Sequence, residues 1–177
     1  MSIASKEPQE FPLDAFSDVL NANSTYAQTF EHTDLTGRAA RGLAIVTCMD
    51  SRISPLEIVG MQPGDVKILR NAGARVTDDV LRTLVLATWL LNVNRILVMP
   101  HTDCRMASQS EAQMHAAIMA ESGIDTRGIE IRTVANPLEA LAVDIQRIRS
   151  YPLLPENLVV GGAVYDVDSG KLIPHSA

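Results

Sequence analysis

Short apolar runs recur along this chain and alternate with longer segments of helical period. The runs are rich in β-branched residues, which is typical of strands buried on both faces of a sheet. One further segment alternates apolar and polar residues, as a half-buried strand does. We therefore expect strands at 42–47, 66–69, 95–99 and 158–165, together with the alternating segment at 129–134.

Helix signals fill the gaps between the expected strands. Ser54 followed by Pro55 is typical of a helix start. Thr77 and two acidic residues begin a strongly apolar helical segment that continues to Leu91. Because apolar residues cover most of its circumference, we expect that helix to be buried. Two further helices are expected at 108–121, before Gly123, and at 137–149.

The alternation of strands with helices predicts an α/β fold, a small, mostly parallel β-sheet flanked by helices. A turn sequence at 168–170 precedes a short apolar segment at 171–173. We expect these residues to form a C-terminal hairpin that adds an antiparallel edge strand.

The first 40 residues are the least regular part of the chain. Weak apolar patterns at 15–20 and 25–31 predict one or two helices there. We divide the chain into an N-terminal helical arm, 1–40, and a single α/β domain, 41–177. The alternative for the arm is a frayed surface segment.

Composition narrows the class of protein. The 177 residues are 46% hydrophobic and 20% charged, which fits one globular domain and excludes a disordered chain. The net charge is −6 and no basic cluster occurs, so we expect neither a nucleic-acid nor a membrane partner. The N-terminus lacks the apolar segment of a secretory signal, and we expect a cytoplasmic protein with reduced thiols.

The residues with the most chemistry follow the expected strands. Cys48 and Cys104, the only two cysteines, follow the first and third strands, and His101 lies beside Cys104. Ligands of open α/β sheets bind at the carboxyl ends of the strands. Two thiolates and one imidazole suit zinc, and three protein ligands leave a fourth position open, as catalytic zinc requires.

Other interpretations of the two cysteines remain open at this point. Each cysteine taken singly can be a small core residue. A disulfide fits a reducing compartment poorly. A dithiol redox centre would be expected to carry a C-x-x-C motif, which the chain lacks.

Three motifs together resemble the β-class carbonic anhydrases. The stretches 46–53 and 101–104 are similar to the short bacterial and archaeal branch of that family, which also includes carbonyl sulfide and carbon disulfide hydrolases. The resemblance is strict from about residue 44 to 106 and looser to 170. The motifs are Cys48-x-Asp50-x-Arg52, then Arg70-Asn71-Ala72-Gly73, then His101-x-x-Cys104.

The resemblance implies a role for each motif. Zn²⁺ would be bound by Cys48, His101 and Cys104. Asp50 and Arg52 would form a catalytic dyad beside the metal. The backbone at Ala72 and Gly73 would form walls of the substrate pocket. The family works as homodimers or multiples of dimers, with the N-terminal helices packed on the partner subunit.

The implied reaction is the reversible hydration of CO2 to bicarbonate and a proton. Zinc-bound hydroxide would attack the carbon, oriented by Asp50, which Arg52 holds in a bidentate pair. If that pair breaks, Asp50 is free to take the open zinc position itself. The alternatives are hydrolysis of carbonyl sulfide or carbon disulfide at the same site, and a non-catalytic zinc- or bicarbonate-binding homologue. The dyad argues against the last, because a binder has no need to orient a nucleophile.

For three residues within or after the third motif, the sequence leaves alternatives open. Arg105 stands where the family usually has glycine, and it points either into solvent or inward, where a cation would affect anion binding. With an inward Arg105, the substitution Arg105→Gly would change anion inhibition or substrate preference. Asp103, between two ligands, is expected to be a supporting or solvent-facing acid. His115 is expected on a solvated helix face, with a proton shuttle as the alternative.

Overall fold

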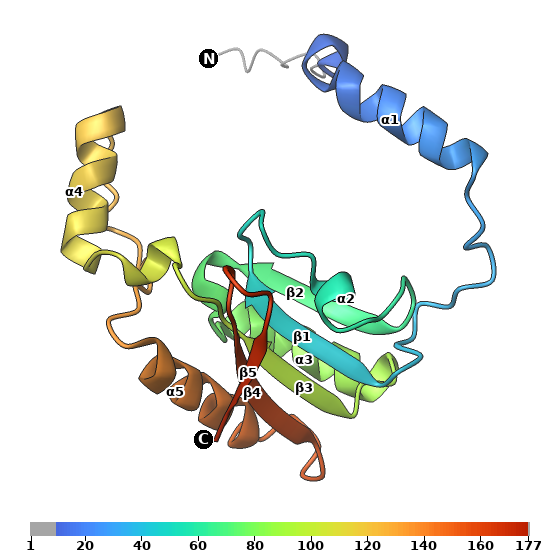
Figure 1. Cartoon of the computed structure of the whole chain (residues 1–177). Helices are drawn as coiled ribbons and strands as arrows, with labels where there is room; N and C mark the ends of the chain where they lie inside the picture. Colours follow the sequence, from blue (N-terminus) through green and yellow to red (C-terminus); the bar gives the residue numbers. More distant parts are fainter. Residues whose placement is uncertain (1–9, 177) are drawn as a thin grey trace, which may run out of the picture. The chain divides into compact units, whose positions relative to one another are not determined.

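The computed structural model describes residues 10–176 and divides the chain into two compact units that meet between Leu35 and Thr36. In the first unit, a short 3-10 helix, η1 (Leu13–Phe16), leads into α1 (Ser17–Gln28). Every described residue of this unit is exposed. The helical arm expected from the sequence is thus confirmed as one α-helix (Figure 1), while residues 1–9 of the arm lie outside the described range.

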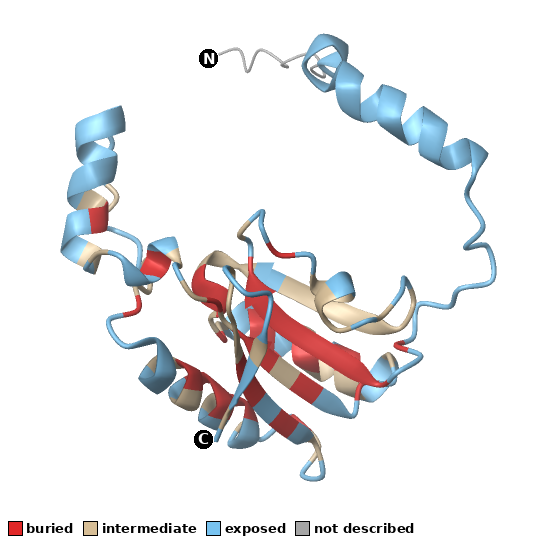
Figure 2. Cartoon of the chain, in the orientation of Figure 1, coloured by how far each residue is buried: buried red, intermediate tan, exposed pale blue. Residues whose placement is uncertain are grey.

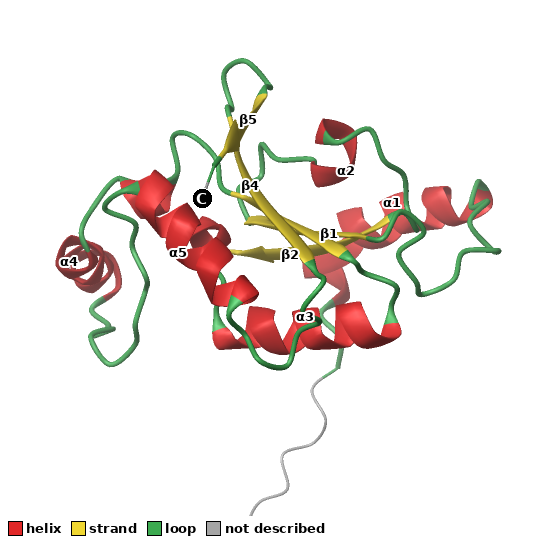
Figure 3. Ribbon diagram, turned by 90° about the horizontal axis from the view of Figure 1, so that it is seen from below, coloured by secondary structure: helices red, strands yellow, loops and turns green. Residues whose placement is uncertain are grey.

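The second unit is built on a five-stranded sheet of order β2-β1-β3-β4-β5. The first four strands in that order pair in parallel, and β5 pairs antiparallel with β4. This topology confirms the mostly parallel sheet and the C-terminal edge hairpin (Figures 1 and 3). The strands are β1 (Leu43–Cys48), β2 (Val66–Asn71), β3 (Arg95–Met99), β4 (Val159–Tyr165) and β5 (Leu172–His175).

Two helices, α3 (Asp78–Leu90) and α5 (Pro137–Arg149), pack their apolar residues on one face of the sheet. The short α2 (Pro55–Ile58) and the residues after it pack on the other face. Strand β1 is buried along its whole length, as its uninterrupted apolar run predicted (Figure 2). Among the described residues, no helix is both long enough and apolar enough to cross a membrane.

Helix α3 is only partly buried, in contrast to the expectation from its composition. Leu81 and Leu84 belong to the core, but Trp89 and Leu90 are 61% and 62% exposed. Strong apolarity around the whole circumference therefore leaves an apolar strip on the outside of this unit. Such a strip is typical of a surface that another element or subunit covers.

Helix α4 (Glu111–Ser122) begins three residues later than the pattern predicted. Its start is set by a capping box, in which Ser110 and Gln113 exchange side-chain and backbone hydrogen bonds. Its end is set by Gly123, whose φ of 72° terminates the helix in the left-handed conformation.

The strand expected at 129–134 is wrong, because these residues form a loop. The backbone N–H groups of Ile131 and Arg132 donate to the Glu111 carboxylate, at 2.6 and 3.2 Å, instead of to a neighbouring strand. Arg132 has a φ of 63°, which interrupts an extended backbone. The alternation of apolar and polar residues therefore belongs to a loop, which the Glu111 side chain holds together with a backbone hydrogen bond from Val134 to Met106.

This loop should depend on pH through Glu111. Hydrogen bonds from backbone N–H groups, that of Ile131 first, lower the pKa of Glu111 below its usual 4.5. A lowered pKa means that the stabilisation is present above pH 4.5 and is lost as the pH falls through the lowered value. We expect the Ile131 amide proton to titrate below pH 4.5 in NMR spectra. The titration should vanish in Glu111→Gln and persist in Glu130→Gln; an unchanged titration in Glu111→Gln would contradict this assignment.

Candidate metal centre

Three side chains with metal-ligating atoms meet at the carboxyl edge of the sheet. Cys48 ends β1, and His101 and Cys104 lie in the loop between β3 and the 3-10 helix η3 (Arg105–Ala107). Parallel pairing of β1 with β3 brings the two loops together. The ligand atoms of the three residues lie within 4.8 Å of one another, and the two sulfur atoms are 4.0 Å apart.

This geometry fits a tetrahedral zinc ion. Zinc–sulfur bonds of about 2.3 Å at tetrahedral angles place two sulfur atoms roughly 3.8 Å apart, close to the separation observed. The Nδ1 of His101 lies 2.7 Å from the carbonyl oxygen of Thr102, so Nδ1–H donates and the Nε2 lone pair is free. Nε2 is buried with no hydrogen-bond partner among the described residues. A buried nitrogen without such a partner is typical of an atom that binds a metal ion.

The surroundings of Cys104 favour its protonated thiol over the thiolate that a metal would bind. Both cysteines are free. Burial raises the pKa of Cys104, and the neighbouring Cys48 raises it further. A bound cation reverses this effect because it stabilises the thiolate form of both side chains. The disulfide alternative therefore does not describe this structure, in which the sulfur atoms lie far beyond the ~2.05 Å of an S–S bond.

A tight turn after β2 supports the Cys48 sulfur. The backbone N–H of Gly73 donates to the Cys48 Sγ at 3.4 Å. Gly73 has a φ of 80°, and a Cβ at this position would lie 3.2 Å from the side chain of Met106. The glycine predicted to line the substrate pocket thus also contacts a candidate ligand.

The sequence analysis included Asn71 in the second motif but assigned no role to it, and the structure shows that this residue closes the turn. The Asn71 side chain accepts a hydrogen bond from the Arg75 N–H at 2.8 Å and donates to the Arg75 carbonyl at 2.7 Å. Asn71 lies at the end of β2 rather than beyond it, opposite Cys48 in the parallel register. The only local signal was an asparagine directly before a glycine-containing segment, which is typical of a turn.

Asp50 and Arg52 form the pair that the sequence predicted. Asp50 accepts from the Arg52 backbone N–H at 2.9 Å, from Nε at 3.0 Å and from Nη2 at 2.8 Å. These bonds hold the pKa of Asp50 well below its usual range and raise the pKa of Arg52. The Oδ2 of Asp50 lies 3.8 Å from the free Nε2 of His101, so the carboxylate stands beside the candidate ligands.

Two further charged residues hold the loop that carries this pair. Arg70 donates to the carbonyl groups of Cys48 and Asp50, at 2.9 and 2.7 Å. The Asp103 carboxylate accepts from the Arg52 Nη1 at 2.8 Å. Asp103 therefore supports the site and lies outside the candidate ligand set, as its position in the sequence suggested.

Arg105 points away from the ligands. It is exposed and donates to Gln109 at 3.3 Å, so the outward of the two expectations agrees with the structure. The left-handed residue of this loop is Asp103, with a φ of 52°, and Arg105 shows no positive φ. The loop therefore needs no glycine at position 105.

We consequently expect Arg105→Gly to leave the metal site unchanged. Anion inhibition constants and zinc content of the variant should match those of the parent protein within about twofold, because an exposed side chain is removed without a buried contact. Titration of inhibition by iodide or azide provides the measurement. A marked change in those constants would contradict this prediction and support an inward orientation of Arg105.

His115 lies elsewhere and is mostly buried, so the expected solvated helix face is wrong. Its Nδ1 lies 2.8 Å from the Thr126 hydroxyl and its Nε2 lies 3.9 Å from the Glu111 carboxylate. These partners belong to α4 and the loop after it, whereas the candidate ligands lie in the loops beyond β1 and β3.

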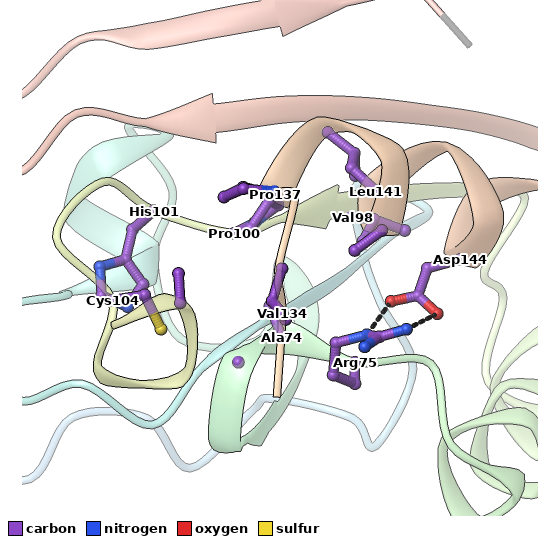
Figure 4. A pocket seen from close by; sticks show the side chains of 13 residues that line it. Ala74, Arg75, Val98, Pro100, His101, Cys104, Val134, Pro137, Leu141 and Asp144 are labelled. Carbon is purple, nitrogen blue, oxygen red and sulfur yellow. Dashed lines mark hydrogen bonds and ion pairs between the residues drawn. The ribbon is translucent and has the colours of Figure 1, made fainter. Parts of the chain in front are cut away.

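An apolar pocket opens beside His101 and Cys104 (Figure 4). Its walls come mainly from the turn after β2, the end of β3 and the first turns of α5. The far end is closed by an ion pair in which Arg75 Nε donates to Asp144 Oδ2 at 2.7 Å. The apolar lining includes Gly73, Ala74, Val98, Pro100, Val134 and Leu141, while Ala72 is outside it.

The chain is similar to known proteins over most of its length. A family model described as carbonic anhydrase matches residues 43–172. Beta-carbonic anhydrase 1 of Mycobacterium tuberculosis is 33% identical over 155 residues, which cover 88% of this chain and 94% of that protein. A carbon disulfide hydrolase of Saccharolobus solfataricus is 30% identical over 156 residues, 75% of this chain and 76% of that protein.

A solved structure gives the same result. The crystal structure of a carbonic anhydrase from Streptococcus mutans matches with a TM-score of 0.86 and 33% identity, over 95% of this chain and all of that one. The family match also includes all three candidate ligands and the Asp50–Arg52 pair. The chain belongs to the β-carbonic anhydrase family of zinc lyases.

Proposed function

We propose that this protein is a zinc-dependent carbonic anhydrase that interconverts CO2 and bicarbonate. The observation that carries the proposal is the Asp50–Arg52 pair, whose carboxylate lies 3.8 Å from the free Nε2 of His101. Cys48, His101 and Cys104 would hold the Zn²⁺. Zinc bound in such a set lowers the pKa of a coordinated water toward ~7 and so supplies a nucleophile for the carbon of CO2.

The protein groups around the metal have distinct tasks in this proposal. Asp50 stays ionised because of its lowered pKa, so it accepts a hydrogen bond from the nucleophile and aims it at the substrate. Arg52 holds that carboxylate at two oxygen atoms and keeps it from rotating. Thr102 orients the ring of His101, and the Gly73 N–H stabilises the charge on Cys48.

The pocket suits an uncharged, linear substrate. Its walls beside the ligands are mostly apolar, and the Arg75–Asp144 pair at its end is neutral as a unit. These features also support the second candidate, hydrolysis of carbonyl sulfide or carbon disulfide, which are linear like CO2. The similarity to a carbon disulfide hydrolase favours keeping that candidate. A non-catalytic zinc- or bicarbonate-binding role is less consistent with the intact dyad.

Stopped-flow CO2 hydration on protein of known zinc content tests the proposal. We expect chelator-sensitive activity that rises from neutral to mildly alkaline pH, and Asp50→Asn should lose most of it while retaining zinc. Sulfide release from carbonyl sulfide and carbon disulfide should be measured on the same sample. Zinc-loaded protein that releases sulfide but does not hydrate CO2 would establish the second candidate instead.

We also propose that the chain works at least as a dimer, with the arm expected at 1–40 packed on the partner subunit. The described part of the arm exposes many apolar side chains, too many for a free surface. The exposed apolar side chains are those of Phe11, Leu13, Phe16, Val19, Leu20, Tyr26 and Phe30.

We further propose that the protein works in the cytoplasm, because a centre with two thiolates fits a reducing compartment.

A charge on the apolar side of α1 should weaken the assembly. Val19 is 56% exposed, and we expect Val19→Glu to shift the protein toward monomer because it would bury a carboxylate in the interface. Sedimentation equilibrium at micromolar concentration provides the measurement. Asn21, which lies on the opposite side of the same helix, supplies the control, since Asn21→Glu adds the same charge away from the apolar face. A well-folded, active monomer in the parent protein would overturn the proposal.

A further inference from the structure

The hydrogen-bonded arrangement of Asp50 and Arg52, which we call the Asp-x-Arg fork, occurs twice in the described chain. At Asp125 and Arg127 the carboxylate accepts from the backbone N–H at 3.0 Å, from Nε at 2.9 Å and from Nη2 at 2.7 Å. The three bonds of Asp50 and Arg52 have the same pattern, with distances of 2.9, 3.0 and 2.8 Å. The fork is therefore a local structure that a two-residue spacing forms by itself. It does not by itself determine where its carboxylate lies relative to a distant ligand.

Arg52 differs from Arg127 in having a second partner. Its Nη1 donates to the Asp103 carboxylate at 2.8 Å and its Nη2 donates to the Asp103 carbonyl at 3.1 Å. Asp103 lies in the ligand loop, between His101 and Cys104. The hydrogen bonds and ion pairs of the described residues give Arg127 only Asp125 as a partner. Arg52 alone of the two thus joins its own loop to another.

The guanidinium of Arg52 is used almost completely by these contacts. Four of its five N–H groups are engaged, two toward Asp50 and two toward Asp103. The fork and Asp103 therefore occupy two adjacent edges of one rigid, planar group, and both edges include Nη2. A movement of the ligand loop at Asp103 is transmitted through that plane to the Asp50 carboxylate.

The backbone at Asp103 is adapted to this contact. Its φ of 52° lies in the left-handed region, which aspartate and asparagine tolerate better than most residues. That conformation presents both the carboxylate and the carbonyl of one residue to Arg52. Two acceptors from a single residue fix the guanidinium against rotation, which a single ion pair would not do.

We propose that Asp103 is a positioning residue that holds the outer edge of Arg52 and thereby sets the place of the Asp50 carboxylate beside His101. This inference rests on the proposed function, in which Asp50 orients the nucleophile. Asp103 itself lies outside the candidate ligand set and outside the lining of the pocket. Its loss should leave the fork intact, as the fork at Asp125 shows, but free to move relative to the ligand loop.

Two substitutions test the proposal on the zinc-loaded protein. Asp103→Gly removes the carboxylate and keeps the left-handed backbone, and Asp103→Asn keeps the shape and removes the charge. Because Arg52 and Asp103 are 45% and 79% exposed, we expect Asp103→Gly to lower kcat/KM for CO2 hydration only roughly three- to tenfold, with a smaller loss in Asp103→Asn. Asp125→Asn breaks the matching fork away from the site and should leave kcat/KM unchanged.

Metal binding provides a readout independent of turnover. Chelator competition should give the same zinc and cobalt(II) affinity for Asp103→Gly as for the parent, because Asp103 is not a ligand. The visible spectrum of the cobalt(II)-loaded variant should shift, because the carboxylate beside the metal has moved. A zinc affinity that falls in parallel with activity would overturn the proposal, since the substitution would then act on the ligand loop itself.

A double-mutant cycle decides whether Asp103 acts through Arg52. In an Arg52→Lys background, Asp103→Gly should change neither the residual activity nor the cobalt(II) spectrum. An equal effect in both backgrounds, or none in either, would overturn the proposal. If the parent protein does not hydrate CO2, the proposed function fails, and the cobalt(II) spectra of the four proteins still decide the role of Asp103.

Discussion

Each of the substitutions Cys48→Ser, His101→Ala and Cys104→Ser is expected to abolish stable zinc binding and, with it, CO2 hydration. Their ligand atoms lie within 4.8 Å of one another, and the remaining two cannot hold the ion as three do. The loss of zinc affinity should exceed the ~10–100-fold typical of losing a residue that merely supports a ligand. Zinc content after dialysis and the affinity in competition with a chelator provide the measurements.

Two controls separate ligand loss from general damage. His115→Ala removes a mostly buried histidine that bonds Thr126 and Glu111, and it should retain one zinc per chain. The chain has only two cysteines, so alkylation reports directly on the centre. Both thiols should be protected with zinc and reactive after chelation. Full zinc retention by any of the three ligand variants would remove that residue from the proposed centre.

Chelation of the parent protein should also lower its stability. Zinc binds only the folded arrangement of the three side chains, so its binding free energy adds to that of folding. The melting temperature should fall on removal of zinc and recover when zinc is returned. This comparison has to be made at one protein concentration, because association of subunits shifts the melting temperature as well.

Arg75→Met should be strongly destabilising, although Arg75 lies outside the ligand set. Asp144 is 3% exposed, and its carboxylate is paired with Arg75 in a bond of 2.7 Å between Nε and Oδ2. Removing the guanidinium leaves a buried, uncompensated negative charge, which lowers the free energy of unfolding by about 3–5 kcal/mol. Urea unfolding of the zinc-loaded protein, at fixed concentration, provides the measurement.

The double substitution Arg75→Met with Asp144→Leu should recover most of this loss, because it removes both charges together. Arg127→Met supplies the matched control, since it leaves the half-exposed carboxylate of Asp125 in contact with water and should change the free energy of unfolding little. If Arg75→Met were no more destabilising than Arg127→Met, the buried pair would not be important for stability. Because Asp144 lines one pocket together with His101 and Cys104, the zinc content of each variant should be recorded too.

Local patterns determined most of the elements of this fold. Helix α5 begins and ends as predicted, at Pro137 and Arg149, because its start is set by Asn136, whose side chain caps the first turn. Strand β1 was predicted within one residue at each end, because an uninterrupted apolar run has no other way to be buried. These signals act over a few residues and need no knowledge of the rest of the chain.

The failures lie where a distant residue intervenes. The alternating segment at 129–134 has the pattern of a strand, but Glu111, twenty positions earlier, takes its N–H groups. The apolar circumference of α3 indicated burial, yet which side faces the sheet and which stays exposed follows only from packing. A sequence pattern indicates the structures that a segment can form, and the residues packed around the segment determine which of these structures it adopts.

The candidate site divides in the same way. Residue types and spacing indicated Cys48, His101 and Cys104 as candidate ligands, the family resemblance implied the Asp50–Arg52 pair, and the structure brings all five together. The supporting contacts were invisible in the sequence. Four supporting contacts appear only in the structure: the hydrogen bonds between Asn71 and Arg75, the bond from the Gly73 N–H to the Cys48 sulfur, the bonds between Arg52 and Asp103, and the Arg75–Asp144 ion pair.

This division between sequence and structure follows from the range over which each interaction acts. Amino-acid type sets the chemistry of a side chain, and spacings of two or three residues set local geometry, so the sequence alone predicted most of the elements and the candidate ligands and, through the family resemblance, the Asp50–Arg52 pair. Parallel pairing of β1 with its two neighbours brings three loops to one edge of the sheet. Only that tertiary arrangement decided how the loops hold one another and where the Asp50 carboxylate lies beside His101.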